Sequence, residues 1–186
     1  MKKFKISILA VMAMTATFIT GCSSDDDAPA PVNEEEVITT LTATLTPVGG
    51  GAAITLQSRD LDGDGPDAPV ITVSGNLAAS TTYNGAIVLL NETETPAENI
   101  TLEVEEEDDE HQFFFTTTTS LNITTANLNL DGNGNPLGTT FDVTTGAAST
   151  GSYTITLRHE PTKPNTGLSD AGGETDISVT FPVTIQ

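Results

Sequence analysis

The chain has few of the residues that carry redox chemistry, thiolate metal binding or stacking against sugars. It contains one cysteine, two tyrosines, two histidines and no tryptophan among 186 residues. A single cysteine cannot close a disulfide within the chain, and it leaves no thiol pair for a metal. No serine or threonine stands in a nucleophile-elbow context. We therefore predict that the protein is not an enzyme and has no organic cofactor.

Basic residues are also scarce, and half of them lie at the very start of the chain. From Cys22 onward only Arg59, Arg158 and Lys163 oppose all 26 acidic residues, which gives a net charge of −23. Such a surface repels phosphate backbones, so nucleic acid is excluded as a partner, and cations are the natural ligands. The alternative is that the negative charge serves only solubility.

The first residues have the pattern of a bacterial lipoprotein signal. Lys2, Lys3 and Lys5 precede an apolar run from Ile6 to Ile19, and Ile19-Thr20-Gly21-Cys22 has the form of a lipobox. We predict that residues 1–21 are a signal peptide and that Cys22 is lipidated, which makes the membrane a partner through the lipid. The alternative, an ordinary thiol beyond a membrane helix, is disfavoured because the run is shorter than the roughly 20 residues a spanning helix needs.

Residues 22–36 show no apolar periodicity and carry two acidic runs, Asp25–Asp27 and Glu34–Glu36. This composition predicts a flexible acidic tether. Ser23, rather than an aspartate, follows the lipidated cysteine, which favours the outer membrane. The acidic run behind Cys22 resembles the surface-export signal of Bacteroidota lipoproteins, and this resemblance implies exposure at the cell surface. A plain solvated spacer is the alternative.

Residues 37–186 carry the alternation typical of half-buried strands. Threonine and β-branched residues alternate with apolar ones, and Gly, Asp, Asn and Pro separate the runs. We predict one all-β domain, an antiparallel Greek-key sandwich of nine or ten strands. The clearest runs are Leu41/Ala43/Leu45, Ile54/Leu56, Ile71/Val73, Ile100/Leu102/Val104, Tyr153/Ile155/Leu157 and Ile177/Val179/Phe181/Val183/Ile185.

A local pattern narrows the topology further. Leu77, Thr81 and Tyr83 match the L-x3-T-x-Y run that opens a late strand in sandwiches similar to immunoglobulin and fibronectin type III domains. In those domains the tyrosine hydroxyl bonds to backbone upstream, forming a tyrosine corner. We expect Tyr83 to have this structural role; a plain strand aromatic is the alternative.

The whole chain also resembles a known group of proteins, most clearly in three segments: 60–66 (DLDGDGP), 111–115 (HQFFF) and 157–161 (LRHEP). Through them the chain resembles small acidic flavobacterial lipoproteins that are commonly described as having a type 1 periplasmic binding fold. That fold has two lobes of alternating strands and helices, whereas this mature chain is short and has no helical period. The resemblance therefore implies a location and supplies no activity.

Two loops have the alternating carboxylates of calcium sites. Asp60, Asp62 and Asp64 precede Gly65 as in D-x-D-x-D-G, with Asp67 or backbone carbonyls available to complete the shell. The residue at position twelve is Ile71 rather than glutamate, so a simple acidic turn is an equal alternative. A weaker candidate repeats the spacing and consists of Asp131, Asn133, Asn135 and Asp142; there Pro136 replaces the glycine, and a hairpin with an Asx-rich tip is favoured.

The remaining candidates are the run Glu105–Glu110 and the two histidines. Six adjacent carboxylates after a strand ending at Val104 predict a mobile turn or diffuse binding of divalent ions. His111 and His159, the latter beside Glu160 and upstream of Asp170, Glu174 and Asp176, have the side chains that ligate zinc or copper. Imidazoles on exposed strand edges are the favoured interpretation.

Two functions fit these observations. The first is a lipid-anchored, non-catalytic interaction or structural module, facing the cell surface or the periplasm and stabilised by Ca²⁺. The second is a metal-ion capture lipoprotein that assists an outer-membrane importer, with His111, His159 and neighbouring carboxylates as ligands. The two differ in the residues they need. Joint ligation requires His111 and His159 to lie within a few ångströms of each other.

Overall fold

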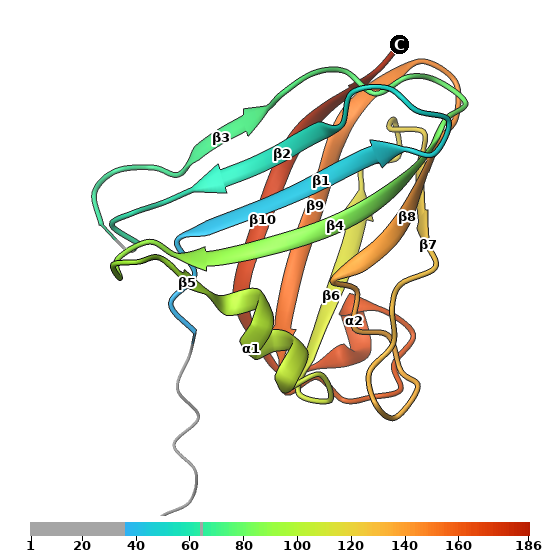
Figure 1. Cartoon of the computed structure of the whole chain (residues 1–186). Helices are drawn as coiled ribbons and strands as arrows, with labels where there is room; N and C mark the ends of the chain where they lie inside the picture. Colours follow the sequence, from blue (N-terminus) through green and yellow to red (C-terminus); the bar gives the residue numbers. More distant parts are fainter. Residues whose placement is uncertain (1–35, 64) are drawn as a thin grey trace, which may run out of the picture. The chain divides into compact units, whose positions relative to one another are not determined.

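The computed structural model describes residues 36–63 and 65–186, which belong to one compact unit. The predicted signal peptide, Cys22 and nearly all of the predicted tether lie outside the described residues, as does Asp64. The described residues contain ten strands and two short helices (Figure 1). In chain order they are β1 (Thr40–Pro47), β2 (Ile54–Arg59), β3 (Val70–Val73), β4 (Thr82–Asn91), β5 (Glu98–Asn99), α1 (Ile100–Glu106), β6 (His111–Thr117), β7 (Ile123–Ala126), β8 (Thr140–Thr145), β9 (Ser149–His159), α2 (Leu168–Ala171) and β10 (Glu174–Ile185).

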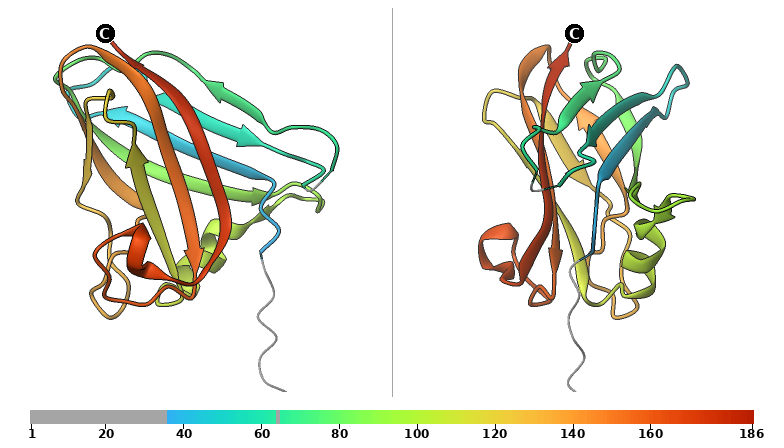
Figure 2. Two further views of the ribbon diagram at one scale, coloured as in Figure 1. Left: turned by 180° about the vertical axis from the view of Figure 1, so that it is seen from behind. Right: turned by 90° about the vertical axis from the view of Figure 1, so that its left-hand side faces the viewer.

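The strands form two antiparallel sheets, which confirms the all-β sandwich predicted from the alternation. The larger sheet has the order β3-β2-β1-β4-β8-β7, with β5 paired to β4, and the smaller has the order β10-β9-β6. The order β3-β2-β1-β4 is a Greek key, because β4 returns beside β1 after two hairpins. Figure 2 shows the two layers from behind and edge-on. The division into seven and three strands departs from the four and three of constant-type immunoglobulin domains.

Alternation places the core between the sheets. In β4 every second residue from Tyr83 to Leu89 faces inward, and β9 and β10 contribute the facing side chains. The largest fully buried side chains include Tyr83, Tyr153, Phe113 and Phe181. Among the described residues, no helix is long and apolar enough to cross a membrane.

Tyr83 makes the bond expected of a tyrosine corner. Its hydroxyl oxygen accepts a hydrogen bond from the Ala78 N–H at 2.7 Å, and the side chain is buried. The neighbouring Leu77 pairs with Ile185 at the end of β10. The hydroxyl therefore links β4 of the larger sheet to a segment that is bonded to the smaller sheet.

We expect Tyr83→Phe to lower the free energy of unfolding by about 1–3 kcal/mol, because the Ala78 N–H would stay buried without an acceptor. Chemical denaturation followed by circular dichroism measures the loss. Tyr153→Phe is the matched control: its hydroxyl pairs with the Thr125 hydroxyl at 2.7 Å, which can rotate to another partner, so its loss should be smaller. Equal stability of Tyr83→Phe and the wild type would contradict the corner's role.

One predicted strand is wrong. Residues 100–106 form α1, although Ile100, Leu102 and Val104 alternate at period two. The Asn99 side chain caps the helix by accepting from the Thr101 N–H, and Ile100 and Val104, four residues apart, face the core while Leu102 is 63% exposed. The Thr101 hydroxyl fixes the helix to β4 by accepting from the Leu89 N–H at 2.7 Å. The run 105–110 is consequently the end of a helix and a short turn, not a free loop.

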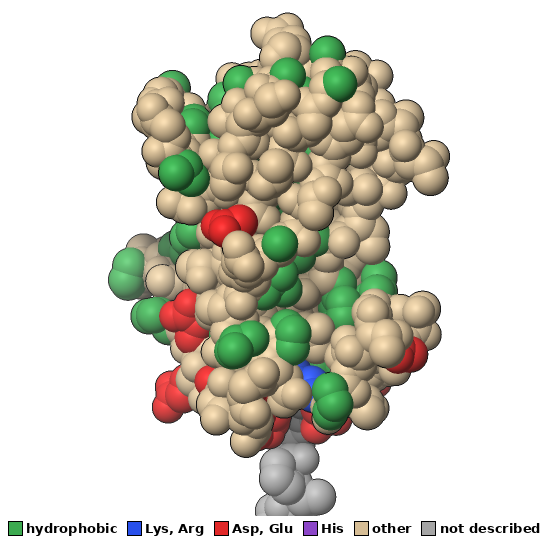
Figure 3. All heavy atoms as spheres, turned by 90° about the vertical axis from the view of Figure 1, so that its right-hand side faces the viewer, with side chains coloured by type: hydrophobic (Ala, Val, Ile, Leu, Met, Phe, Trp, Pro, Cys, Tyr) green, Lys and Arg blue, Asp and Glu red, His purple; other side chains and the backbone are tan. Residues whose placement is uncertain are grey.

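Charge is concentrated at one end of the sandwich. The connections at the end away from Glu36 hold no charged side chain; they are residues 48–53, 74–81, 118–122 and 146–148. At the opposite end every connection carries carboxylates, and the described chain begins there. Figure 3 shows one face, with acidic side chains toward the lower end and none at the upper end. A cation near this protein is therefore drawn to the end at which the described chain begins.

Candidate functional site

His111 and His159 meet inside the acidic end. His111 opens β6 and His159 ends β9, and the two are register partners in the antiparallel pair. Their rings stack with centroids 4.6 Å apart, and both residues are buried, with 0% and 3% exposure. The interpretation as exposed edge imidazoles is wrong, because both side chains point to the inner face of the smaller sheet.

Asp176 joins them from the neighbouring strand. The register of β10 against β9 shifts between Thr175 and Ile177, and Asp176 is the extra residue at this bulge. The extra residue of a bulge breaks the alternation of the strand, so a side chain can be turned from one face of the sheet to the other. The Asp176 side chain is consequently 1% exposed, with Oδ1 3.8 Å from His159 Nδ1.

Glu36 completes the group from outside the sheet. Its Oε1 lies 2.8 Å from His111 Nε2 and its Oε2 lies 3.7 Å from His159 Nδ1, and the side chain is 4% exposed. Glu36, which the sequence pattern predicts to be part of the tether, therefore belongs to the folded domain instead. Its Oε2 is buried and makes no hydrogen bond to a described residue.

The four side chains can together hold one metal ion. One ligand atom from each of Glu36, His111, His159 and Asp176 lies within 4.8 Å of all the others. Bonds of 2.0–2.2 Å in a tetrahedral zinc site place ligand atoms about 3.4 Å apart, so small side-chain rotations would close this set around an ion. Two imidazoles and two carboxylates match the preferences of zinc and its neighbours among the first-row metals.

The hydrogen bonds around the histidines select the nitrogen that would ligate. His111 Nδ1 lies 3.1 Å from the Glu107 carbonyl, an acceptor, so Nδ1 carries the proton and Nε2 faces the group. His159 Nδ1 faces Glu36 and Asp176, while its Nε2 lies 3.8 Å from Oε2 of the exposed Glu110. Metal-bound histidines usually donate from their second nitrogen to a carbonyl or carboxylate, as His111 Nδ1 does here to the Glu107 carbonyl, whereas His159 Nε2 makes no hydrogen bond to a described residue.

The contacts within the group favour the charged forms of His111 and Glu36. Burial opposes the imidazolium of His111, but hydrogen bonds with Glu36 and the Glu107 carbonyl outweigh it, so the pKa of His111 lies above its ordinary value. Burial also opposes the charged form of Glu36, which by itself would raise its pKa. The hydrogen bond from His111 and the charges of both imidazoles outweigh burial, so the pKa of Glu36 lies below its ordinary value. A metal ion would take the place of the His111 proton between the same groups.

The loop predicted to bind calcium is an exposed turn. Asp60 accepts from the Gly63 N–H at 3.1 Å and the Asp62 carboxylate accepts from the Asp67 N–H at 3.2 Å. Among the described residues these carboxylates do not gather into a set of three or more within reach of one ion. Because Asp64 is outside the described residues, calcium at this loop stays a prediction.

The second predicted loop is a hairpin tip, as favoured. Leu130 pairs with Pro136 across it, and Asp131 Oδ1 accepts from the N–H groups of Asn133 and Asn135 at 2.9 and 2.7 Å. Asp142 lies in β8 and accepts from the Asn127 side chain. Asp131 and Asp142 are thus occupied by separate protein partners.

Three carboxylates near His159 in the sequence stay outside the four-residue group. Glu160 is exposed at a left-handed turn, with φ of 48°. The Asp170 carboxylate accepts from the N–H and hydroxyl of Thr166. Glu174 is exposed at the start of β10. Proximity in sequence therefore pointed to the wrong acids, apart from Asp176.

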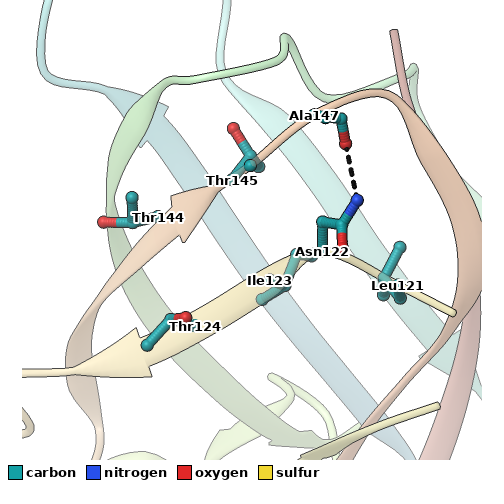
Figure 4. Close-up of a pocket in the computed structure, with 8 residues that line it drawn as sticks. Leu121, Asn122, Ile123, Thr124, Thr144, Thr145 and Ala147 are labelled. Carbon is teal, nitrogen blue, oxygen red and sulfur yellow. Dashed lines mark hydrogen bonds between the residues drawn. The ribbon is translucent and has the colours of Figure 1, made fainter. Parts of the chain in front are cut away.

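The uncharged end has a shallow hollow of about 500 Å³ between β7, β8 and the loops beside them. Figure 4 shows the residues around it, with Asn122 donating to the Ala147 carbonyl at 3.1 Å. Its lining consists of Leu121, Asn122, Ile123, Thr124, Thr144, Thr145, Gly146 and Ala147. None of these side chains ionises or ligates metals strongly.

Comparison of the chain with protein-family models, with curated proteins and with solved structures finds no match.

Proposed function

We propose that the protein is a lipid-anchored, non-catalytic metal-binding domain that holds one zinc-class ion between Glu36, His111, His159 and Asp176. The observation that carries this proposal is the convergence of two imidazoles and two carboxylates in a buried cluster, with ligand atoms within 4.8 Å of one another. Four protein ligands fill a tetrahedral shell, which favours holding an ion over catalysing a reaction on one.

Zinc suits this set better than calcium. Calcium takes six to eight oxygen ligands and does not choose imidazole nitrogen, whereas two of the four ligands here are histidines. Nickel and copper also accept imidazole, so competition between these ions sets the occupant. The meeting of His111 and His159 favours the capture hypothesis over the calcium-stabilised module.

The surroundings of the site support the capture of cations. Glu110, whose side chain is 53% exposed, lies at the edge of the group beside His159, and the acidic run 105–109 precedes it. Carboxylates at a rim raise the local concentration of divalent ions. With lipid at Cys22, such a domain would work at the outer membrane, and we propose an importer there as its partner.

The proposal predicts one tightly bound zinc ion per chain. We expect calorimetric titration of the detergent-solubilised, chelator-treated protein with zinc to give a stoichiometry of one. At a hundredfold excess over Kd, zinc should raise the free energy of unfolding by about 2.7 kcal/mol. Both effects should be absent in His111→Ala/His159→Ala.

A matched pair of carboxylate variants distinguishes zinc binding at the four-residue site from nonspecific binding to the acidic surface. Asp176→Asn should lose the zinc response, while Asp60→Asn/Asp62→Asn should keep it. Because Asp176→Asn keeps the shape of the side chain, its circular dichroism spectrum without metal shows whether the fold is retained. Undiminished zinc binding in folded Asp176→Asn and in the double histidine variant would refute the proposed function.

A further inference from the structure

Three of the four ligands lie on strands of the smaller sheet, and the fourth does not. His111 and His159 are paired in the β6–β9 ladder, and Asp176 is held at the bulge between β9 and β10. These three residues form a rigid face of two imidazoles and one carboxylate. Glu36 lies in the non-strand segment before β1.

The hydrogen bonds that tie the start of the described chain to the larger sheet begin at Thr39, three residues after Glu36. Thr39 donates its N–H to the Leu90 carbonyl at 2.9 Å, and its hydroxyl accepts from the Glu92 N–H at 2.8 Å. Before Thr39, Ile38 packs partly against the core while Val37 is 56% exposed. The hydrogen bond that Glu36 accepts from His111 is therefore the main polar contact between the start of the described chain and the smaller sheet.

Glu36 also covers the other three ligands. Its two carboxylate oxygens face different histidines, one 2.8 Å from His111 Nε2 and the other 3.7 Å from His159 Nδ1. All four side chains are at most 4% exposed, so an ion needs one of them to move before it can enter or leave. Glu36 is the one of the four that does not lie on a strand. Figures 1 and 2 show the described chain starting at the same end of the sandwich at which β9 ends and β10 begins.

Building on the proposed function, we infer that Glu36 is an exchangeable fourth ligand, and that its departure opens the position through which zinc enters and leaves. The three strand-borne ligands retain the ion while Glu36 is away. This arrangement allows a buried site to deliver its ion, which a capture protein must do. It also couples occupancy to the segment that leads back toward Cys22, because a bound ion would hold residues 36–39 against the smaller sheet.

The test compares the rate of zinc release among variants of the full chain. Zinc-loaded protein is mixed with excess pyridylazoresorcinol, and the coloured complex is followed by stopped flow. We expect Glu36→Gln to keep one zinc per chain and to release it at least about tenfold faster than the wild type, since ligand changes act mainly on dissociation rates. Glu98→Gln, which removes an equally negative but exposed side chain, should release zinc at the wild-type rate.

Hydrogen exchange supplies a second measurement. Zinc should slow amide exchange at Val37 and Ile38 in the wild type and leave it unchanged in Glu36→Gln. Release from Glu36→Gln at the wild-type rate would overturn the inference and leave the proposed function standing. So would complete loss of binding, as expected for Asp176→Asn, because Glu36 would then be an indispensable ligand. Absence of zinc binding in the wild type would overturn both.

Discussion

Lys163→Met is expected to lower the free energy of unfolding by about 3–5 kcal/mol, because it breaks a buried ion pair and leaves the carboxylate uncompensated. The Lys163 side chain is 6% exposed, and its ammonium lies 3.1 Å from Oδ2 of Asp131, whose side chain is buried. It also donates to the carbonyls of Asp108 and His111 at 2.7 and 2.6 Å. All three protons of the ammonium are therefore used, and the side chain joins the β9–β10 loop to the hairpin tip and to the start of β6.

Urea denaturation of Lys163→Met and the wild type measures this loss. Arg59→Met is the control, since the Arg59–Glu92 pair is shorter, at 2.6 Å against 3.1 Å, but lies at the surface with 46% of the Arg59 side chain exposed. Solvent screens such a pair, so its loss should be much smaller. Lys163→Met/Asp131→Asn should recover part of the stability, because it removes the unpaired charge. Similar losses in the two single variants would contradict the structural role of Lys163.

The effect of Lys163 should also depend on pH in a definite direction. Burial opposes ionisation of Asp131, but hydrogen bonds from Asn135 and Lys163 outweigh it, so the pKa of Asp131 lies below its ordinary value of 3.8. A lowered pKa stabilises the fold above the ordinary value and the contribution disappears as the pH falls through the lowered one. The difference in stability between the wild type and Lys163→Met should therefore shrink below a pH of about 4.

The alternation of residues in the sequence already places both histidines of the site on the inner face of the smaller sheet. In β9, Tyr153, Ile155 and Leu157 face inward, and His159 continues that series. In β6, Phe113 is buried and His111 lies two residues before it. Period two therefore places both histidines on the core face. The interpretation as edge imidazoles failed because it treated them as strand ends rather than as members of the alternating series.

The two carboxylates could not be found in this way. In β10 the inward-facing residues Val179 and Ile177 predict that Thr175 also faces inward. Asp176 would then face solvent, and only the bulge between Thr175 and Ile177 turns it inward. Glu36 is the last of three glutamates in a segment without periodicity, and nothing local distinguishes it from the others. The helix α1 was missed because two apolar residues at i and i+4 also satisfy period two, and its cap and exposed Leu102 are visible only in three dimensions.

Gly173→Ala is expected to lower the free energy of unfolding by about 2–5 kcal/mol, the sum of a left-handed backbone penalty and overpacking. Gly173 precedes β10 with φ of 70°, and a Cβ atom there would lie 2.2 Å from the His159 carbonyl oxygen and 2.9 Å from the backbone of Glu160. These are backbone atoms, which cannot rotate away. The end of β9 must therefore shift, and His159 must move with it.

The adjacent glycine isolates the clash from the backbone penalty. Gly172 has φ of 63°, but a Cβ there would meet only the Thr162 hydroxyl at 3.9 Å. Gly172→Ala should therefore cost about 1–3 kcal/mol, the penalty of its backbone conformation alone, with φ of 63° and ψ of −149°. Because the clash displaces His159, Gly173→Ala should also weaken zinc binding, whereas Gly172→Ala should leave it unchanged. Urea denaturation measures both losses of stability. Equal losses in the two variants would show that the β9–β10 turn tolerates a side chain at Gly173. The close approach of Gly173 to the His159 carbonyl would then not fix the position of this ligand.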